Sequence, residues 1–556
     1  MDVTVTNPKQ NAVHYPPDRR FIVWIRRNFL VALAMLIVLP VVAAWAQYLI
    51  AGLPVVPQSY PTAADLTAPA GFPGWLRLAH FVNFLFIVLL ARSGLSILMD
   101  HPRLYWNSNC TPGTEWMRFT PVEAPMDHIW TAKDDARYIS PWLGLPGFRH
   151  TIGTARHWHL LSALFWLVNG LVFVLLLLST DYWMRLVPNS WRIIPEAWAL
   201  FVHYATFHMP FEPDPYYAYN AMQQLAYFTV VFVMAPLSML TGLAMSPAIA
   251  NRFRWYPKLF GGRQAARSIH FLLLLGYTGF FVVHVTLVVM TGFARNMNYI
   301  VLGSDDGRLT GLLIGLAGIG FVVVACFVAY WFSWRHPRSL QYLVRRIHSV
   351  MRFLFFRHIV PRAQYSEADI SPYFWPNGKP PTTDEWQALA ANDFRDFRLK
   401  VFGLVDNPLE LSLEEMKALG PQSQITMHHC IQGWSGVAQW GGLSLAKLIE
   451  LAQPRPEAKV CVFYSFGEGL YGGDYYDTQS LENAMHPQSL LAYEMNDAPL
   501  PPVYGAPLRL RVENQLGYKM VKWIKSIEFV TSEKSVGKGH GGKNEDDEYF
   551  DLFPEI

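Results

Sequence analysis

The fold is decided by residues 268–292, which read SIHFLLLLGYTGFFVVHVTLVVMTG. Two histidines, His270 and His284, interrupt this apolar run and stand 14 residues apart. At about 3.6 residues per turn and 1.5 Å per residue, that spacing makes nearly four turns and roughly 21 Å. Both imidazoles therefore lie on one helix face, near opposite surfaces of a bilayer. The stretch predicts a membrane helix that holds two stacked metal centres.

Two further histidines stand near the start of apolar runs, His80 in 77–99 and His159 in 157–180. A b-type haem between helices takes two neutral imidazoles, so four helix-borne histidines suffice for two haems. Any one of them could instead bond only a polar neighbour, although ionisable groups inside a membrane generally mark function. His157 is an alternative to His159, because the two point about 200° apart on a helix and only one faces the bundle.

The apolar residues concentrate before residue 334, and the composition after it is that of a soluble domain. Six stretches are long enough to span a bilayer. They are residues 28–50, 77–99, 157–180, 222–245, 268–292 and 310–333. We therefore predict an all-α transmembrane bundle of six helices over residues 28–333, followed by a separate soluble domain.

The distribution of positive charge predicts the orientation of this bundle. The formal net charge of +3 is too small to indicate a nucleic-acid partner. Lysines and arginines in alternate segments between the spans total 23 against 4. The positive-inside rule then places both termini, including residues 1–27, on the cytoplasmic side of a bacterial inner membrane. His80 and His284 fall together on the outer side, and His159 and His270 on the inner side.

The N-terminal region allows a second interpretation. Residues 26–30, RRNFL, precede the first apolar run and resemble a twin-arginine export signal. We predict instead that these basic residues flank a first membrane helix, because the run is long enough to span. The four cysteines, Cys110, Cys326, Cys430 and Cys461, contain no C-x-x-C spacing, so no disulfide framework is expected.

Residues 334–365 alternate apolar and basic residues at helical spacing. The pattern predicts a basic amphipathic helix that lies on the anionic inner leaflet. A plain connecting helix packed on protein is the alternative. Beyond it, short strands and Pro/Gly turns predict an α+β domain over 366–556 with a mostly antiparallel sheet. The tail from residue 533 is not expected to have a core of its own.

The secondary structure expected within this domain is coarse. Expected strands cover residues 398–405, 459–466, 508–513 and 526–531, and expected helices cover 413–419 and 443–451. Residues 428–435 read HHCIQGWS, so Cys430 leaves a probable strand and enters a turn with Gly433. A thiolate exposed in such a turn is a soft ligand for a redox metal. An inert buried cysteine is the other interpretation of the same residues.

Three segments resemble the di-haem cytochrome b subunits of hydrogenases, formate dehydrogenases and thiosulfate reductases. They are RHWH at 156–159, APLSMLTGLAMSP at 235–247 and RSIH at 267–270, and the match covers roughly residues 75–295. The first and sixth predicted helices depart from that family's four-helix core. The resemblance implies exchange of electrons with a quinone near one haem. His203 and His208 are candidates for that pocket, with an ordinary loop role as the alternative.

The soluble part resembles the molybdenum-binding domain of the sulfite oxidase family, especially the bacterial branch that contains the methionine sulfoxide reductase catalytic subunit. The segments are HCIQGWS at 429–435, WGGL at 440–443, SPYFWPNG at 371–378, LAYEMN at 491–496, GAPLR at 505–509 and GYKMVKW at 517–523. The resemblance implies that Cys430 supplies the protein sulfur to molybdenum. It also implies a pterin site formed by Phe374, Asn377, Ser465, Tyr504, Arg509, Met520, Val521 and Lys522. Arg511 and Lys519 could add positive charge for the cofactor phosphate.

These features together predict a membrane-bound molybdenum oxidoreductase. Two haem b groups would connect the quinone pool to a molybdenum–molybdopterin site that transfers an oxygen atom. Reduction of an S-oxide or N-oxide by quinol is favoured over oxidation of a small sulfite-like oxyanion, from the resemblance alone. The alternative is a membrane electron-transfer protein whose soluble domain binds a partner or pterin without turnover. Membrane lipids are expected partners, and a homo-oligomer or a further electron-transfer subunit is open.

Overall fold

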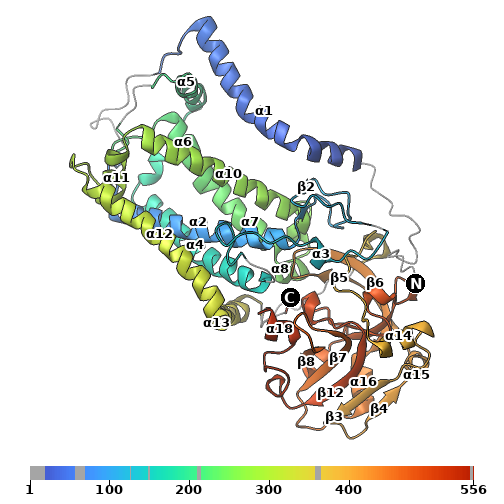
Figure 1. The fold of residues 1–556 in the computed structure, drawn as a ribbon. Helices are drawn as coiled ribbons and strands as arrows, with labels where there is room; N and C mark the ends of the chain where they lie inside the picture. Colours follow the sequence, from blue (N-terminus) through green and yellow to red (C-terminus); the bar gives the residue numbers. More distant parts are fainter. Residues whose placement is uncertain are drawn as a thin grey trace.

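The computed structural model describes residues 19–56, 69–125, 127–147, 151–209, 214–356, 365–550 and 555–556. A helical bundle forms one end of the molecule and a sheet-containing domain the other (Figure 1). Most of the predicted segment 1–27, and the end of the predicted linker, lie outside the described residues. The two-part fold predicted from the sequence is confirmed.

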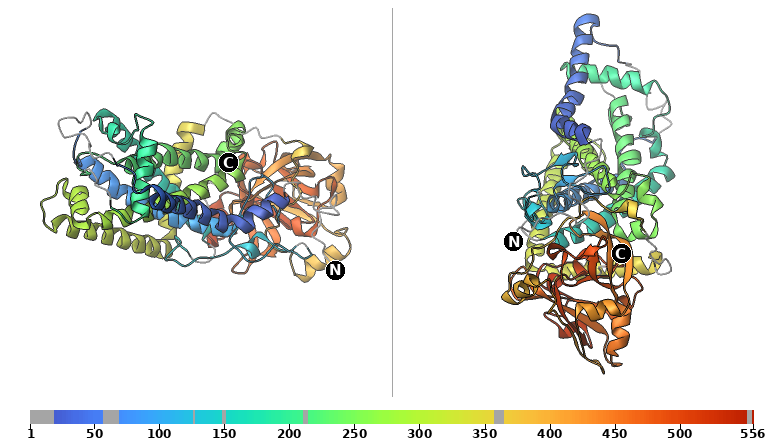
Figure 2. Two further views of the ribbon diagram at one scale, coloured as in Figure 1. Left: turned by 90° about the horizontal axis from the view of Figure 1, so that it is seen from above. Right: turned by 90° about the vertical axis from the view of Figure 1, so that its right-hand side faces the viewer.

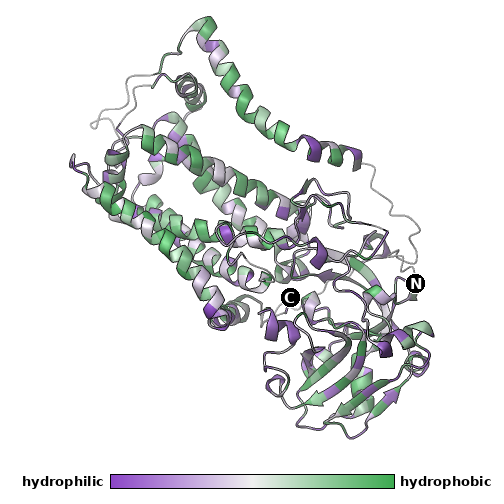
Figure 3. Cartoon of the chain, in the orientation of Figure 1, coloured by the Kyte–Doolittle hydropathy of each residue, from purple (hydrophilic) through white to green (hydrophobic). Residues whose placement is uncertain are grey.

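Six helices in the described part of the chain are long and apolar enough to cross a membrane, which confirms the predicted spans. They are α1 (Arg19–Ala51), α2 (Gly74–Asp100), α4 (Ile152–Ser179), α6 with α7 (Ala221–Phe228 and Ala235–Met245), α10 (Arg263–Met290) and α12 (Thr310–Arg335). Apolar residues line all six (Figure 3). Several helices begin before the start of their apolar runs. The basic residues that precede these runs, on the side predicted to be cytoplasmic, belong to the same helices.

The fourth span contains a local irregularity. Residues Thr229–Met234 form a π turn between α6 and α7. Pro236 comes two residues after this turn and has no N–H to donate to the preceding turn of helix. The wider π turn lies directly before it. The fourth span is therefore one continuous helix with a π turn in its middle.

Short helices lie between the spans. They are α3 (Ala132–Asp135), α5 (Ile193–Ala205), α8 (Pro247–Arg252), α9 (Trp255–Lys258) and α11 (Phe293–Leu302). The first span, α1, stands apart from the other long helices along its middle (Figures 1 and 2). Its ends are held, since Arg26 pairs with Glu115 at 2.7 Å and Trp198 of α5 donates to Gln47 at 2.8 Å.

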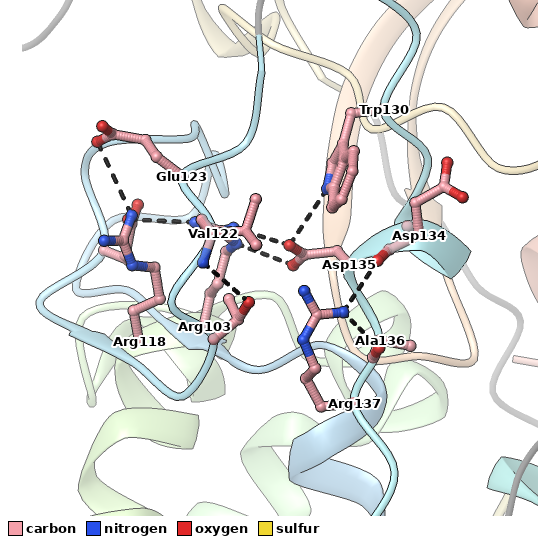
Figure 4. A network of polar contacts seen from close by, with 12 residues as sticks. Arg103, Arg118, Val122, Glu123, Trp130, Asp134, Asp135, Ala136 and Arg137 are labelled. Carbon is pink, nitrogen blue, oxygen red and sulfur yellow. Dashed lines mark hydrogen bonds and ion pairs between the residues drawn. The ribbon is translucent and has the colours of Figure 1, made fainter.

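The long segment between α2 and α4 is an ordered unit. It contains β1 (Arg103–Leu104), β2 (Met117–Arg118) and α3, and we call residues 101–147 the inter-domain segment. Arg103 is fully buried and bonds Asp135 at 2.7 and 2.8 Å (Figure 4). It also bonds Glu115 at 3.2 Å. Removing one partner would leave an uncompensated charge in the interior. The network therefore holds this segment in one conformation.

The predicted amphipathic helix is present as α13 (Pro337–Phe356). Its first half packs on protein, since Leu340 and Val344 are buried and Arg338 donates to the carbonyl of Asp546 at 2.7 Å. Its second half exposes apolar side chains, namely Val350, Met351, Phe353, Leu354 and Phe355. The first half therefore fits a connecting helix packed on protein, and a position of the second half on the inner leaflet stays a prediction.

Two sheets build the soluble domain. The first has the order β10-β9-β6-β5, with β11 also on β9, and comprises β5 (Gln422–His429), β6 (Ser435–Ser444), β9 (Leu490–Met495), β10 (Ala498–Pro499) and β11 (Arg509–Arg511). The second has the order β4-β3-β12-β7-β8 and comprises β3 (Leu399–Gly403), β4 (Leu409–Leu411), β7 (Val460–Glu468), β8 (Asp474–Ser480) and β12 (Ile524–Val530). Among the described strands, β12 and β3 pair in parallel and the other pairs are antiparallel. The mostly antiparallel prediction is therefore confirmed.

The helices of this domain are short. They are α14 (Asp384–Ala391), α15 (Leu413–Ala418), α16 (Leu445–Ala452), α17 (Leu481–Ala484) and α18 (Lys543–Asp547). The helix predicted over 443–451 begins two residues late, because β6 continues through Ser444. The described residues of the tail after residue 533 pack on the domain, with Phe550 and Ile556 buried.

Candidate functional site

The four predicted histidines form two pairs. The ring centres of His159 and His270 are 6.3 Å apart, and those of His80 and His284 are 6.4 Å apart. Two imidazoles on opposite sides of one metal ion have ring centres about 6 Å apart, since a metal–imidazole bond is about 2 Å long. Both pairs therefore have the separation that ligation of one iron by two imidazoles requires. The pairing is the one that charge counting predicts.

Neighbouring hydroxyl groups set the tautomer of the inner pair. Ser93 Oγ donates to the carbonyl of Leu89 at 2.7 Å and lies 3.1 Å from His159 Nδ1. Thr241 Oγ1 donates to Leu237 at 2.7 Å and lies 2.9 Å from His270 Nδ1. A hydroxyl has one proton, so each oxygen accepts from the Nδ1–H of its histidine. Both Nε2 atoms then carry free lone pairs, as a metal ligand needs.

Replacing Thr241 with Val is expected to weaken haem binding at the inner pair by about 10-fold to 100-fold, the usual cost of losing the outer partner of a metal-bound histidine. The same change should raise the midpoint potential of that haem, because an imidazole without its hydrogen-bond acceptor donates less charge to iron. Haem content and a redox titration check both effects. Thr278→Val is the matched control, since the hydroxyl of Thr278 donates to the carbonyl of Leu274 at 2.8 Å within α10. Equal behaviour of the two variants would contradict the assignment.

The other histidines considered from the sequence have different positions. His159, and not His157, lies opposite His270. His203 lies in α5 and not in a loop, and its Nε2 bonds the carbonyl of Pro54 at 2.9 Å. His208 Nδ1 lies 3.1 Å from Thr206 Oγ1, and its ring lies 4.8 Å from that of Tyr48. These contacts are structural, which favours the ordinary role for both.

Cys430 lies in the turn between β5 and β6. Its N–H donates to Trp434 O, and its carbonyl accepts from Gly433 N–H, each at 3.1 Å. Gly433 has a φ of +106°, a left-handed conformation that favours glycine. Cys430 is 2% exposed, and burial raises the pKa of its thiol to about 12. Such a thiol stays protonated at neutral pH unless a bound metal ion displaces the proton from sulfur.

The described residues contain no group of three or more His, Cys, Asp or Glu side chains that could hold a metal ion. Phe374 forms the centre of an aromatic wall beside the turn, with ring centres 5.6 Å from Trp434 and 5.7 Å from both Trp440 and Tyr504.

Most of the predicted pterin residues come together in one place. Tyr504 Oη donates to Phe374 O at 2.8 Å, and Arg509 donates to Tyr504 O at 3.1 Å. Lys522 Nζ donates to the carbonyl of Asn377. Ser465 also belongs here, since its hydroxyl donates to Lys522 O at 2.7 Å. Met520 and Val521 are buried in the same segment.

Two of the predicted cations have protein partners of their own. Arg511 forms a two-pronged pair with Glu513, with both distances 2.8 Å, and lies 3.1 Å from His428 Nδ1. Lys519 pairs with Asp477 and, at 2.6 Å, with Glu545. Their charges are already balanced, so the free positive charge at the site comes from Arg509 and Lys522.

The residues present fit a pterin phosphate. Burial lowers the pKa of Arg509 to about 9, and burial, with Arg509 nearby, lowers the pKa of Lys522 well below its ordinary value. A bound anion would relieve both groups. Several buried polar atoms here have no hydrogen-bond partner among the described residues, namely Asn377 Oδ1, His429 Nδ1, Trp434 Nε1, Trp440 Nε1 and Arg509 Nε. Buried polar groups in native proteins are nearly always paired, so these atoms indicate a polar ligand.

The membrane domain also contributes to this site, which the sequence motifs do not indicate. Gln264 of α10 donates to the carbonyl of Gly433 at 3.0 Å, and Gln432 donates to the carbonyl of Asp100 at 3.2 Å. The available signal was the length of the inter-domain segment, since connections this long are commonly functional. Its Cys110 accepts at its carbonyl from Trp375 Nε1 at 2.7 Å.

Comparison with known families agrees with both halves of the fold. Residues 71–301 match the family model described as prokaryotic cytochrome b561. Residues 387–537 match the model described as oxidoreductase molybdopterin binding domain. Haem b and a molybdenum pterin are the cofactors that these two domain types support.

Curated relatives match parts of the chain. The YedZ1 protein of Azospira oryzae, named as a protein-methionine-sulfoxide reductase subunit, is 35% identical over 25% of this chain and 51% of its own length. The protein-methionine-sulfoxide reductase catalytic subunit MsrP of Campylobacter jejuni is 33% identical over 27% and 54%. The sulfane dehydrogenase SoxCD structure from Paracoccus pantotrophus is 22% identical, with a TM-score of 0.23, over 25% of this chain and 39% of that chain. The chain thus spans about half the length of the YedZ1 and MsrP relatives. It is a fusion of a cytochrome b561 membrane domain with an oxidoreductase molybdopterin-binding domain.

Proposed function

We propose that this protein is a membrane-bound molybdenum oxidoreductase that uses quinol to reduce an S-oxide or N-oxide. The names of the matched relatives, which are protein-methionine-sulfoxide reductase subunits, support reduction of an S-oxide. A bound molybdopterin would supply the two-electron chemistry of oxygen-atom transfer, and the protein sets its environment. A quinone near one haem, and the use of two haems, are part of the same proposal.

The observation that carries this proposal is the contact between α10 and the Cys430 turn. The same helix bears His270 and, six residues earlier, Gln264, which donates to Gly433 O at 3.0 Å. Six residues of helix span about 9 Å. Arg263 also donates to Gly433 O, at 3.3 Å. The inner histidine pair and the thiol therefore lie at the two ends of one short rigid connection, as electron exchange between their cofactors requires.

The proposal assigns roles to the residues of both sites. His80 and His284 hold the outer haem, and His159 and His270 hold the inner haem. Cys430 provides the protein sulfur to molybdenum. The pterin contacts are Phe374, Asn377, Ser465, Tyr504, Arg509, Met520, Val521 and Lys522, while Arg511 and Lys519 support the site through their ion pairs. Residues 28–333, 334–365 and 366–556 are the corresponding membrane domain, linker and molybdopterin domain.

We also propose that both termini and the molybdopterin domain lie in the cytoplasm. The soluble domain packs on the end of the bundle where α10 begins, beside the inner histidine pair. Basic residues of the lysine-rich and arginine-rich segments lie at this same end, since Arg267 donates to the carbonyl of His101 and Arg338 donates to the carbonyl of Asp546. The positive-inside rule places such segments in the cytoplasm.

The test follows haem oxidation in the purified full-length protein. Molybdenum and haem are first quantified, and the haems are then reduced with a quinol. Adding dimethyl sulfoxide or trimethylamine N-oxide is expected to reoxidise the haems, while protein from tungstate-grown cells should stay reduced. Haem without molybdenum in the native protein, or no reoxidation at full molybdenum content, would contradict the proposal and favour an electron-transfer protein without turnover.

A further inference from the structure

The turn that holds Cys430 is enclosed by residues of the membrane domain. Arg267 of α10 donates to the carbonyls of His101, at 2.7 Å, and Arg103, at 3.0 Å. A β-carbon at Gly433 would lie 3.6 Å from the Arg267 guanidinium carbon. One arginine therefore joins the inter-domain segment to the turn, and His101 is fixed beside it.

Two side chains of this segment are buried with unpaired polar atoms. His101 is 0% exposed, and neither of its ring nitrogens has a hydrogen-bond partner among the described residues. Tyr105 is also 0% exposed, and its hydroxyl lacks a partner within the same set. Their rings lie 5.9 Å apart, and His101 contacts Trp375 edge-on at 5.1 Å. Tyr105, Trp375 and Cys430 belong to one buried cluster.

Each of these atoms requires a polar partner. An unpaired buried donor is unfavourable, and two adjacent side chains carry such groups here. The predicted pterin contacts all come from residues 366–556, whereas His101 and Tyr105 come from the inter-domain segment. The groups added by the membrane domain are therefore available to a second ligand at the same turn.

We propose that His101 and Tyr105 bind the oxygen of a small S-oxide or N-oxide substrate beside Cys430. The inference rests on the proposed function and adds the substrate class. An S–O or N–O oxygen is a strong acceptor, and a histidine N–H and a tyrosine O–H are donors for it. Because Cys430 is 2% exposed beneath the inter-domain segment, the substrate is a small molecule and not an oxidised side chain of a folded protein.

The test uses Tyr105→Phe and His101→Phe in the full-length holoprotein, since both keep an aromatic ring in place. With a reduced viologen as donor, the KM for dimethyl sulfoxide is expected to rise about tenfold in each variant, the effect of one lost hydrogen bond. The kcat and the molybdenum content should change little. Tyr464→Phe is the control, since its hydroxyl bonds Glu528 at 2.8 Å on the other sheet. Loss of molybdenum with an unchanged KM would overturn the proposal by making these residues cofactor ligands.

Two further measurements separate this inference from the proposed function. Methionine-oxidised calmodulin should be a poor substrate of the unaltered protein. Its efficient reduction would overturn the restriction to small substrates, while the proposed function as an S-oxide reductase would stand. The EPR signal of pentavalent molybdenum, recorded with and without dimethyl sulfoxide, gives a readout independent of turnover. A signal whose response to dimethyl sulfoxide is lost in the Tyr105 and His101 variants supports the assignment, and an unchanged response refutes it.

Discussion

Cys430→Ser is expected to lower the rate of oxide reduction by more than about 100-fold. Loss of a residue that only supports a metal ligand usually costs at most that much. A serine hydroxyl is a hard and weakly acidic ligand, so it cannot replace a thiolate on a soft redox metal. Its size is close to that of cysteine, and the aromatic wall around the turn should stay packed. Turnover with reduced viologen, molybdenum content and the haem spectrum are measured together.

The haem spectrum of this variant should match that of the unaltered protein, because the histidine pairs lie in the membrane helices. Cys326→Ser is the matched control, since Cys326 is a half-buried thiol of α12, away from the turn. That variant should retain full turnover. If Cys430→Ser retained full turnover, Cys430 would be the inert buried cysteine that its residue type alone also allows.

His270→Ala is expected to remove the inner haem and reduce the haem content by half. Alanine offers no lone pair, and one remaining imidazole at His159 cannot complete bis-histidine ligation. Quinol-driven reduction of dimethyl sulfoxide should then cease, because the connection along α10 to the Cys430 turn starts from this haem. Turnover with reduced viologen should persist, since a soluble dye reduces the molybdenum site without the haems.

Two comparison variants make this result specific. His284→Ala should remove the outer haem and leave the inner one, so the two losses can be told apart by their midpoint potentials. His157→Ala should retain both haems, because His157 does not belong to either pair in the structure. Retention of both haems in His270→Ala would refute the pairing of His159 with His270.

The pairing of histidines across helices could be predicted from local patterns. Apolar runs of bilayer length define the spans, and the alternation of basic segments defines their direction. Once direction is known, the depth of each histidine follows from its position along its own helix. His80 and His284, for example, share a depth although 204 positions separate them. No tertiary contact is needed for that argument.

The cofactor side of the soluble domain was predictable to a lesser extent. Resemblance brought Phe374, Asn377, Tyr504 and Arg509 to one site, where the structure also gathers them. The need of a cofactor phosphate for positive charge added Lys519 to them, although Lys519 is neutralised by Glu545 from the C-terminal tail. A basic residue in a sequence motif does not disclose which acid it pairs with, because that acid can lie anywhere in the chain.

The sequence alone was enough for the six apolar spans, the two histidine pairs and the class of each domain, and it predicts a direction for the spans. The contact between the inter-domain segment and the Cys430 turn could not be predicted from it. His101 and Cys430 are 329 positions apart, and Arg267 joins the backbone at His101 to the turn at Gly433. Periodicity and composition report the neighbours of a residue along its own helix or strand. Contacts between elements depend on how the elements pack, and that packing is visible only in three dimensions.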